Sequence, residues 1–136
     1  MMRKLITFVL ISIIASGCAS LTDIPKKMGG TSRRTLEEAK QNSIYQVYSC
    51  DITACFDAVI EIATKANYNI FMKDRVRSFI SLMNVPGVVD TTEVGVFLTE
   101  ISNGKSVRVE LSSRSSPAKK TAAKLLFSEL SERFKK

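Results

Sequence analysis

The sequence of 136 residues contains no histidine. Histidine is the commonest general base and the commonest metal ligand at neutral pH. Its absence excludes Ser-His and Cys-His catalytic arrangements and histidine-based zinc sites within this chain. We therefore expect no metal and no other cofactor, which leaves paired carboxylates as the remaining route to catalysis.

No pair of carboxylates stands out in the sequence. Asp57 and Glu61 are four residues apart on a predicted helix, and Glu61 and Lys65 have the same spacing. That spacing is typical of an ordinary exposed ion pair on a helix. We interpret these side chains as surface residues, predict no catalytic residues, and do not expect an enzyme.

The sequence also lacks an apolar run long enough to cross a bilayer as a helix, which takes about 20 residues. Residues 5–14 form an apolar run of about half that length. Arg3 and Lys4 precede it, and the small residues Ala15, Ser16 and Gly17 lead from it to Cys18. The order of basic, apolar and small residues predicts a secretory signal peptide over residues 1–17.

The segment that ends at Cys18, Ala-Ser-Gly-Cys, resembles the lipobox of bacterial lipoproteins, although Ala15 stands where that family usually has leucine. The resemblance implies that Cys18 is lipidated on sulfur, that the signal is cut before it, and that the new amino group is acylated. Ala19 follows in place of aspartate, which in that family favours transfer to the outer membrane of Gram-negative cells. We therefore expect lipid anchoring at the periplasmic face of the outer membrane. The alternatives are an uncleaved anchor and an ordinary signal with an incidental cysteine.

Residues 18–42 are predicted to be a flexible tether that follows the lipidated cysteine. They contain Pro25 and Gly29-Gly30 and lack an apolar periodicity. As flexible coil, this segment spans roughly 25–30 Å on average. Residues 35–38 (Thr-Leu-Glu-Glu) have the form of a helix capping box, so a short helical turn can begin there.

The basic excess is modest. The net charge is +7, and it falls to +5 when Arg3 and Lys4 leave with the signal. Anionic lipid headgroups and an acidic protein face are both compatible with this charge, as is a solvated basic surface. Nucleic acid is not expected as a partner of an exported, tethered protein.

Cys50 and Cys55 flank the start of a predicted helix. If Asp51 is the N-cap, the two cysteines occupy the positions that touch in a hydrophobic staple. Exported proteins meet oxidising conditions, so we predict a Cys50–Cys55 disulfide that closes the start of this helix. The alternative is two buried free thiols, and the C-x₄-C spacing does not match a redox-active pair.

The clearest local signal is a β-hairpin around Asn103-Gly104, the favoured pair for a two-residue turn. This turn sets Leu98 opposite Val109 and Val96 opposite Leu111. The apolar residues of both strands then fall on one face, so turn chemistry and binary pattern agree. Strands are also predicted over residues 43–49, 68–73 and 76–85. Helices are predicted after Asp51 and from Ser116-Pro117, which we expect to be its N-cap and first residue.

These elements predict an α+β fold over residues 43–136. We expect a mainly antiparallel sheet of about five strands, with two helices on one face and the order β-α-β-β-β-β-α. The other sheet face would be partly solvated. Four apolar residues are expected there and form the candidate interaction face, since an exposed apolar patch marks a contact surface: Phe79, Met83, Phe97 and Ile101.

The stretch VYSCDITACFDAVIEIATKANYNI and the alternation in the last hairpin resemble small uncharacterised bacterial lipoproteins. The domain is also loosely similar to the helix-grip domains of BamC, the lipoprotein of the outer-membrane β-barrel assembly machine. The resemblance implies an accessory or structural role and not catalysis. We expect a lipid-anchored module that binds an envelope protein through the exposed sheet face or an edge strand. The alternative from a different class is a carrier or sensor of a small apolar ligand held between helices and sheet.

Overall fold

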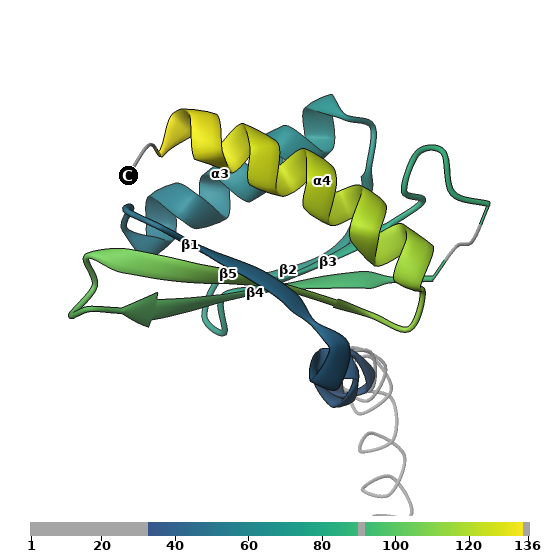
Figure 1. The fold of residues 1–136 in the computed structure, drawn as a ribbon, viewed down its shortest axis with the longest axis horizontal. Coiled ribbons are helices and arrows are strands. Elements are labelled where there is room, and N and C mark those ends of the chain that lie inside the picture. The colour runs from purple at the N-terminus through teal and green to yellow at the C-terminus, as the bar shows by residue number, and fades with distance from the viewer. Residues whose placement is uncertain (1–32, 90–91, 135–136) are drawn as a thin grey trace, which may run out of the picture. The chain divides into compact units, whose positions relative to one another are not determined.

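Five strands form one antiparallel sheet in the computed structural model, which describes residues 33–89 and 92–134. They are β1 (Ile44–Tyr48), β2 (Asn69–Asp74), β3 (Phe79–Met83), β4 (Val94–Ile101) and β5 (Ser106–Ser113), in the spatial order β1-β5-β4-β3-β2. The helices α3 (Ile52–Lys65) and α4 (Ser116–Arg133) cover one face of the sheet (Figure 1). The predicted α+β class and the antiparallel sheet are confirmed.

The starts of the two helices follow from their capping residues. The Asp51 carboxylate accepts a hydrogen bond from the Ala54 amide at 2.9 Å, as predicted for the N-cap of α3. The N-cap of α4 is Ser115, whose hydroxyl accepts a hydrogen bond from the Ala118 amide at 3.2 Å. The predicted cap, Ser116, is therefore wrong by one residue. Pro117 is compatible with either serine as the N-cap. The amides of the first helical turn have no acceptor within the helix, so proline, which has no amide hydrogen, is tolerated throughout that turn.

The hairpin of β4 and β5 has the predicted register. Leu98 lies opposite Val109 and Val96 lies opposite Leu111. The turn is the predicted two-residue turn: the Lys105 amide donates a hydrogen bond to the Ser102 carbonyl at 3.3 Å, and Asn103 and Gly104 between them both have positive φ. Ser102 therefore faces Lys105, and the pairing continues from Ile101 opposite Ser106.

Two details of β2 and β3 differ from the expected pattern. The strand β3 is shorter than the predicted 76–85, because the Asp74 carboxylate accepts a hydrogen bond from the Arg77 amide at 3.1 Å and residues 75–78 turn. The register of β2 against β3 shifts between Ile70 and Met72. Such a bulge bends and twists the strand that carries it.

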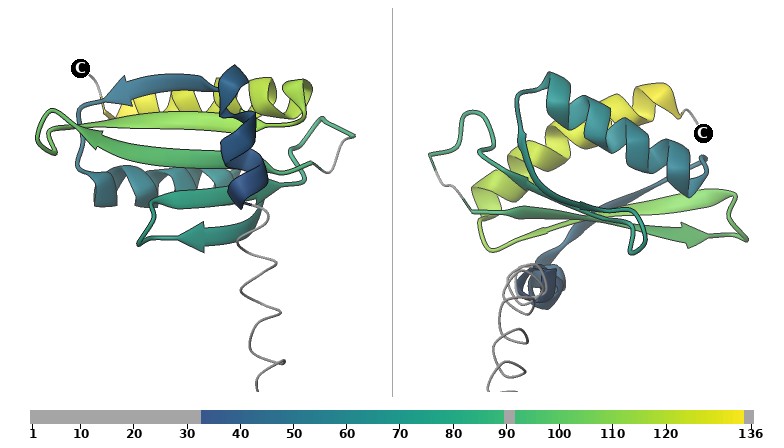
Figure 2. Two further views of the ribbon diagram at one scale, coloured as in Figure 1. Left: turned by 90° about the horizontal axis from the view of Figure 1, so that it is seen from below. Right: turned by 180° about the vertical axis from the view of Figure 1, so that it is seen from behind.

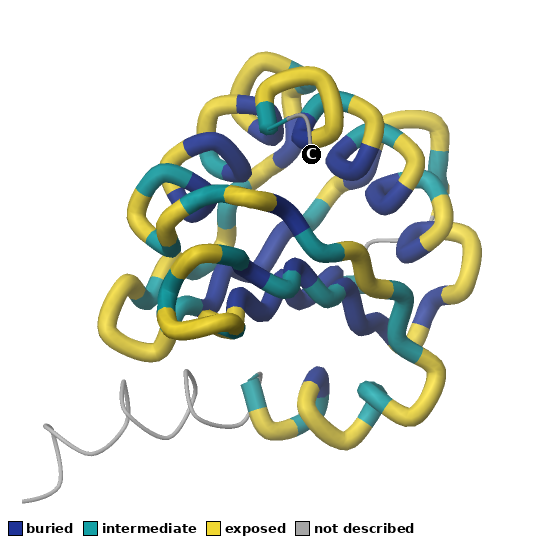
Figure 3. The backbone as a smooth tube through the Cα atoms, turned by 60° about the vertical axis from the view of Figure 1, so that its left-hand side comes forward, coloured by how far each residue is buried: buried dark blue, intermediate teal, exposed yellow. Residues whose placement is uncertain are grey.

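The main core lies between the sheet and the two helices. Figure 3 shows the buried residues of the strands and of both helices gathered there. The strands supply alternate apolar side chains from each of β3, β4 and β5, which are fully buried or nearly so: Ile80, Leu82, Val94, Val96, Leu98, Val107, Val109 and Leu111. The six apolar hairpin residues predicted to share one face are all in this cluster.

The chain on the opposite sheet face differs from the prediction. Residues 33–38 are α-helical and continue into the 3-10 helix η2 (Ala39–Asn42), and we call residues 33–42 the cover helix. It crosses the sheet on the face away from α3 and α4 (Figure 2). The compact unit accordingly begins at Arg33 and not at residue 43. The remaining part of the predicted tether and the predicted signal lie outside the described residues.

Candidate interaction surfaces

The predicted apolar patch is covered at its centre. Phe79 and Phe97 lie directly opposite each other on β3 and β4, with ring centroids 4.9 Å apart. They are only 0% and 5% exposed, because Leu36 of the cover helix packs on them. The expectation that these two rings are solvated is therefore wrong. A single leucine in a polar segment was too weak a signal to place that segment on the sheet.

The surface of the sheet fits the Leu36 side chain closely. Gly95 lies beside it, and a Cβ atom built on Gly95 would be 3.0 Å from Leu36 Cδ1 and 3.0 Å from Phe97 Cε2. A larger residue at this position would require the Leu36 or Phe97 side chain to shift by a few tenths of an ångström. The Leu36 carbonyl also accepts a hydrogen bond from the hydroxyl of Ser112 on β5. Shape and hydrogen bonding thus both hold the cover helix at one place.

Charged groups close the rim of this contact. The Lys40 ammonium lies 4.0 Å from the centroid of the Phe97 ring and 3.9 Å from a carboxylate oxygen of Glu110. A cation over an aromatic face is attracted by the ring quadrupole. The Lys119 ammonium of α4 donates a hydrogen bond to the carbonyl of Asn42, at the end of the cover helix. The cover helix is therefore bound to both β5 and α4.

The other two residues of the predicted face are separated from this cluster. Met83 ends β3 opposite Asn69, whereas Ile101 ends β4 opposite Ser106. Both are half-buried. Since β3 and β4 are antiparallel and Phe79 lies opposite Phe97, these two residues lie at opposite ends of the strands. The structure brings together Phe79 and Phe97 and leaves Met83 and Ile101 outside any common patch.

The predicted cysteine pair is joined in the structure. Cys50 and Cys55 form a disulfide with a Cα–Cα distance of 6.2 Å, and Cys55 is completely buried against the main core. The bond connects the residue before the N-cap of α3 to its first turn. Cys18, the predicted lipidation site, lies outside the described residues.

The two edges of the sheet are built differently (Figure 2). At one edge, β2 carries the bulge and the exposed Lys73, both of which discourage a further strand from pairing. At the other edge, β1 pairs with β5 in unbroken register from Ile44 to Tyr48. Within residues 33–89 and 92–134, no further strand pairs with the outer side of β1.

The open edge of β1 lies beside a hollow of about 540 Å³. Its lining comes from β1 and from the last turn of α4: Tyr45, Gln46, Val47, Tyr48, Ser131 and Phe134. Tyr45 is 54% exposed and holds the Arg108 guanidinium 4.0 Å from its ring centroid. The Tyr48 hydroxyl donates to the side-chain oxygen of Gln46 at 2.9 Å, and burial raises the pKa of Tyr48 above its ordinary value.

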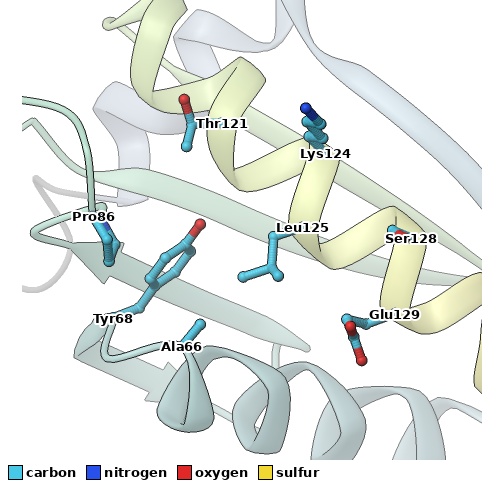
Figure 4. A pocket seen from close by; sticks show the side chains of 8 residues that line it. All are labelled: Ala66, Tyr68, Pro86, Thr121, Lys124, Leu125, Ser128 and Glu129. Atoms are coloured by element: carbon cyan, nitrogen blue, oxygen red, sulfur yellow. The ribbon is translucent and has the colours of Figure 1, made fainter.

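A second hollow, of about 430 Å³, lies between α4 and the chain that leaves α3 (Figure 4). Its lining is apolar at the bottom and polar at the rim: Ala66, Tyr68, Pro86, Thr121, Lys124, Leu125, Ser128 and Glu129. We call it the α4 groove. It lies at the surface over the main core, on the side of the sheet that both helices cover.

The carboxylates noted in the sequence form ion pairs. Glu61 bonds Arg133 of α4 at 2.9 Å and Lys65 at 2.8 Å, and these contacts, with Arg133 contributing most, lower the pKa of Glu61 to about 2. Asp57 bonds Arg75 at 2.7 Å. Among residues 33–89 and 92–134, no three acidic or cysteine side chains are grouped so that they could hold a metal ion.

Sequence reasoning missed both the open β1 edge and the α4 groove. Tyr68 and Leu125 both line the groove, but they are 57 positions apart and nothing in the sequence indicates that they come together. The open edge follows from the strand order, which the hairpin alone does not determine. The exposed Tyr45, the second residue of the short strand β1, was the one local hint.

None of the helices in the described part of the chain has the length and apolar character needed to cross a membrane. No protein-family model and no curated protein matches the chain. The solved structure of a protein from Nitrosospira multiformis is similar over 68% of this chain and 95% of that chain, with a TM-score of 0.49 and 12% sequence identity. A likeness at this level carries no functional argument.

Proposed function

We propose that the protein is a non-catalytic accessory module of the cell envelope, anchored by lipid on Cys18 at the periplasmic face of the outer membrane. In this proposal it binds an envelope protein that adds an extended segment to the open edge of β1. The anchoring rests on the lipobox resemblance of residues 15–18. The binding mode rests on the difference between the two edges of the sheet.

The observation that carries the binding mode is the regular, uncovered edge of β1. An edge strand presents a row of amide and carbonyl groups that can pair with an added strand. The hollow beside β1 provides room for a side chain of that strand, and Tyr45 and Phe134 make its wall partly apolar. The bulged edge of β2 has neither feature.

Site-specific photocrosslinking tests the binding mode in cells. A photoreactive phenylalanine analogue would replace the exposed Gln46 in the full-length chain, and mass spectrometry would identify the crosslinked peptide. We expect one recurring partner peptide from an extended segment. The matched control places the same analogue at Phe71 on the other edge strand, β2, which is exposed as Gln46 is. Equal recovery of that peptide from both positions would contradict a specific β1 site.

A pair of lysine substitutions tests the same edge in the chain that carries the probe at Gln46. Tyr45→Lys places a charge on the edge of β1, and lysine at an edge discourages strand addition. We expect it to remove most of the crosslinked complex, whereas Phe71→Lys leaves the yield unchanged. The proposal fails if the two variants give the same yield.

The anchor is tested separately by intact mass spectrometry of the mature protein from membranes. We expect a chain that begins at Cys18 and carries acyl groups on this residue. A mature chain that begins elsewhere, or an unmodified Cys18, would refute the anchor and leave the β1 site to its own tests.

A further inference from the structure

The Tyr68 hydroxyl lies at the α4 groove and has no hydrogen-bond partner from the described part of the chain. The Tyr68 side chain is 7% exposed and its ring belongs to the main core. Among residues 33–89 and 92–134 its hydroxyl has no hydrogen-bond partner. Figure 4 shows this hydroxyl directed toward α4, above the side chain of Leu125. Its acceptor is therefore water or a ligand in the groove, because hydroxyl groups of largely buried side chains are normally hydrogen-bonded.

The other buried tyrosine of the main core, Tyr48, has hydrogen-bond partners for its hydroxyl. Tyr48 is buried in the same core, and its hydroxyl bonds the side-chain oxygen of Gln46 at 2.9 Å and the carbonyl of Phe127 at 3.3 Å. Burial also raises the pKa of Tyr68 above its ordinary value, so at neutral pH it remains a hydrogen-bond donor. Both tyrosines line a hollow, but only the Tyr48 hydroxyl has hydrogen-bond partners within the described part of the chain.

The charges on the rim indicate the polarity of the ligand. Lys124 lines the groove, and Lys120 lies one helical turn before it on the same side of α4. Within the described part of the chain, neither ammonium forms an ion pair, whereas Lys65 and Arg133 both pair with Glu61. A ligand with an anionic head would complement the free lysines. Glu129 lines the groove more than one turn further along α4, so the head belongs at the Lys124 end.

We propose that the α4 groove binds an anionic amphiphile through a single acyl chain. The chain lies on Leu125, Pro86 and the ring of Tyr68, and the head accepts a hydrogen bond from the Tyr68 hydroxyl and pairs with Lys124. The volume of about 430 Å³ falls within the range of roughly 300–1,000 Å³ found for small-molecule sites. A free fatty acid and one chain of an acidic phospholipid have this chemistry in common. The site is independent of the β1 edge.

Photolabelling of the full-length protein in its membrane tests this site. The probe is a laurate analogue with a diazirine on its chain, and peptide mass spectrometry locates the label. We expect label on the segments that line the groove, displaced by laurate and far less by dodecanol, which has the same chain and no charge. Label confined to other surfaces, or equal displacement by both competitors, would overturn the proposal.

Substitutions with matched controls measure the individual contacts. Tyr68→Phe keeps the buried ring and removes the hydroxyl, so we expect about tenfold more laurate for half-displacement, the lower end for a hydrogen bond to a charged group. Tyr45→Phe removes an exposed hydroxyl and should change nothing. Lys124→Gln should weaken displacement by laurate and not by dodecanol, with Lys105→Gln in the hairpin turn as the charge control. If Tyr68→Phe and Lys124→Gln both match their controls, the assigned head position is wrong.

A second probe distinguishes the two sources of the acyl chain. Phosphatidylglycerol with a diazirine in one chain replaces the laurate analogue in the same membranes. Label from this lipid in the groove identifies a bilayer lipid as the ligand, and label from laurate alone identifies a free fatty acid. Leu125→Glu, which puts a charge into the apolar floor, should abolish label from either probe. Undiminished label in this variant would refute the site.

Discussion

The two faces of the sheet are covered in different ways. On one face, α3 and α4 close a continuous core that includes alternate residues of the three central strands. On the other, the cover helix contributes a single fully buried side chain, Leu36, which packs on Phe79 and Phe97. The same strands therefore serve a large core and a small one, because successive side chains of a strand point to opposite faces.

The difference between the faces indicates how each is held. The main core joins elements from the whole length of the domain, so no part of it can open alone. The small core depends on ten residues at the N-terminal end of the unit, whose loss would leave the sheet and both large helices in place. We therefore expect the cover helix to separate from the sheet at a lower free-energy cost than α3 or α4. Its separation would expose the two phenylalanines predicted as an interaction face.

The largest expected effect comes from the main core. Leu82 is completely buried on β3, and Leu82→Ala would leave a cavity between the sheet and α3 and α4. We expect the free energy of unfolding to fall by about 2–5 kcal/mol, measured by urea denaturation followed by circular dichroism. The whole domain should lose stability together, with no change confined to the cover helix.

A smaller and local effect is expected on the other face. Leu36→Ala removes the one buried anchor of the cover helix, at a cost of about 2 kcal/mol, the lower end for such a change. We expect limited proteolysis to cut within residues 33–42 while the circular dichroism of the sheet is retained. Gln41→Ala, an exposed change on the same helix, should leave the segment protected.

Gly95→Ala reaches the same contact from the sheet side. Its methyl group would displace Leu36 and should reproduce the proteolytic pattern of Leu36→Ala. If either substitution lowers global stability as much as Leu82→Ala does, the two faces are not independent and the comparison fails.

The disulfide lies on the sheet face that carries the main core. Cys50→Ala combined with Cys55→Ala removes a closed loop of about six residues, for which the chain-entropy estimate is about 2 kcal/mol. We expect a lower urea midpoint and an unchanged protease sensitivity of residues 33–42. Reduction of the wild-type protein under native conditions provides the control, and it should lower the midpoint in the same direction.

The smallest expected effect concerns the ion pair between α3 and α4. The folded state lowers the pKa of Glu61 from 4.5 to about 2. A lowered pKa means that the stabilisation is present above about pH 4.5 and is lost as the pH falls toward 2. Arg133→Gln removes the main cause, so the pKa should rise toward 4.5 in a carbon-detected NMR titration. Lys65→Gln should give a smaller rise, and an equal rise would contradict the leading role of Arg133.

Local chemistry made part of this structure predictable. The hairpin register followed from alternation around Asn103-Gly104, the start of α3 from Asp51, and the disulfide from the positions of Cys50 and Cys55 around that cap. Each signal is contained in a few consecutive residues. Such features form in nearly any fold that accepts the segment, so they can be read without knowledge of the rest of the chain.

The candidate sites were not predictable in the same way. The β1 edge is open because β5 pairs with β1 on its other side, and the α4 groove exists because Tyr68 and Leu125 meet across the main core. The burial of Phe79 and Phe97 depends on Leu36, which lies more than 40 positions before them. A pattern among neighbouring residues does not indicate contacts between residues so far apart in the chain.

The sequence by itself therefore determined the fold class, the register of the last hairpin, the cysteine pair and the expectation of an exported, lipid-anchored protein. Only the tertiary structure decided which edge of the sheet is open, which apolar residues are covered, and where a hollow with an unpartnered hydroxyl lies. The physical reason is the range of the interactions. Capping, turns and alternation act between neighbours in the chain, whereas burial and surface shape arise from contacts that the order of the strands brings together.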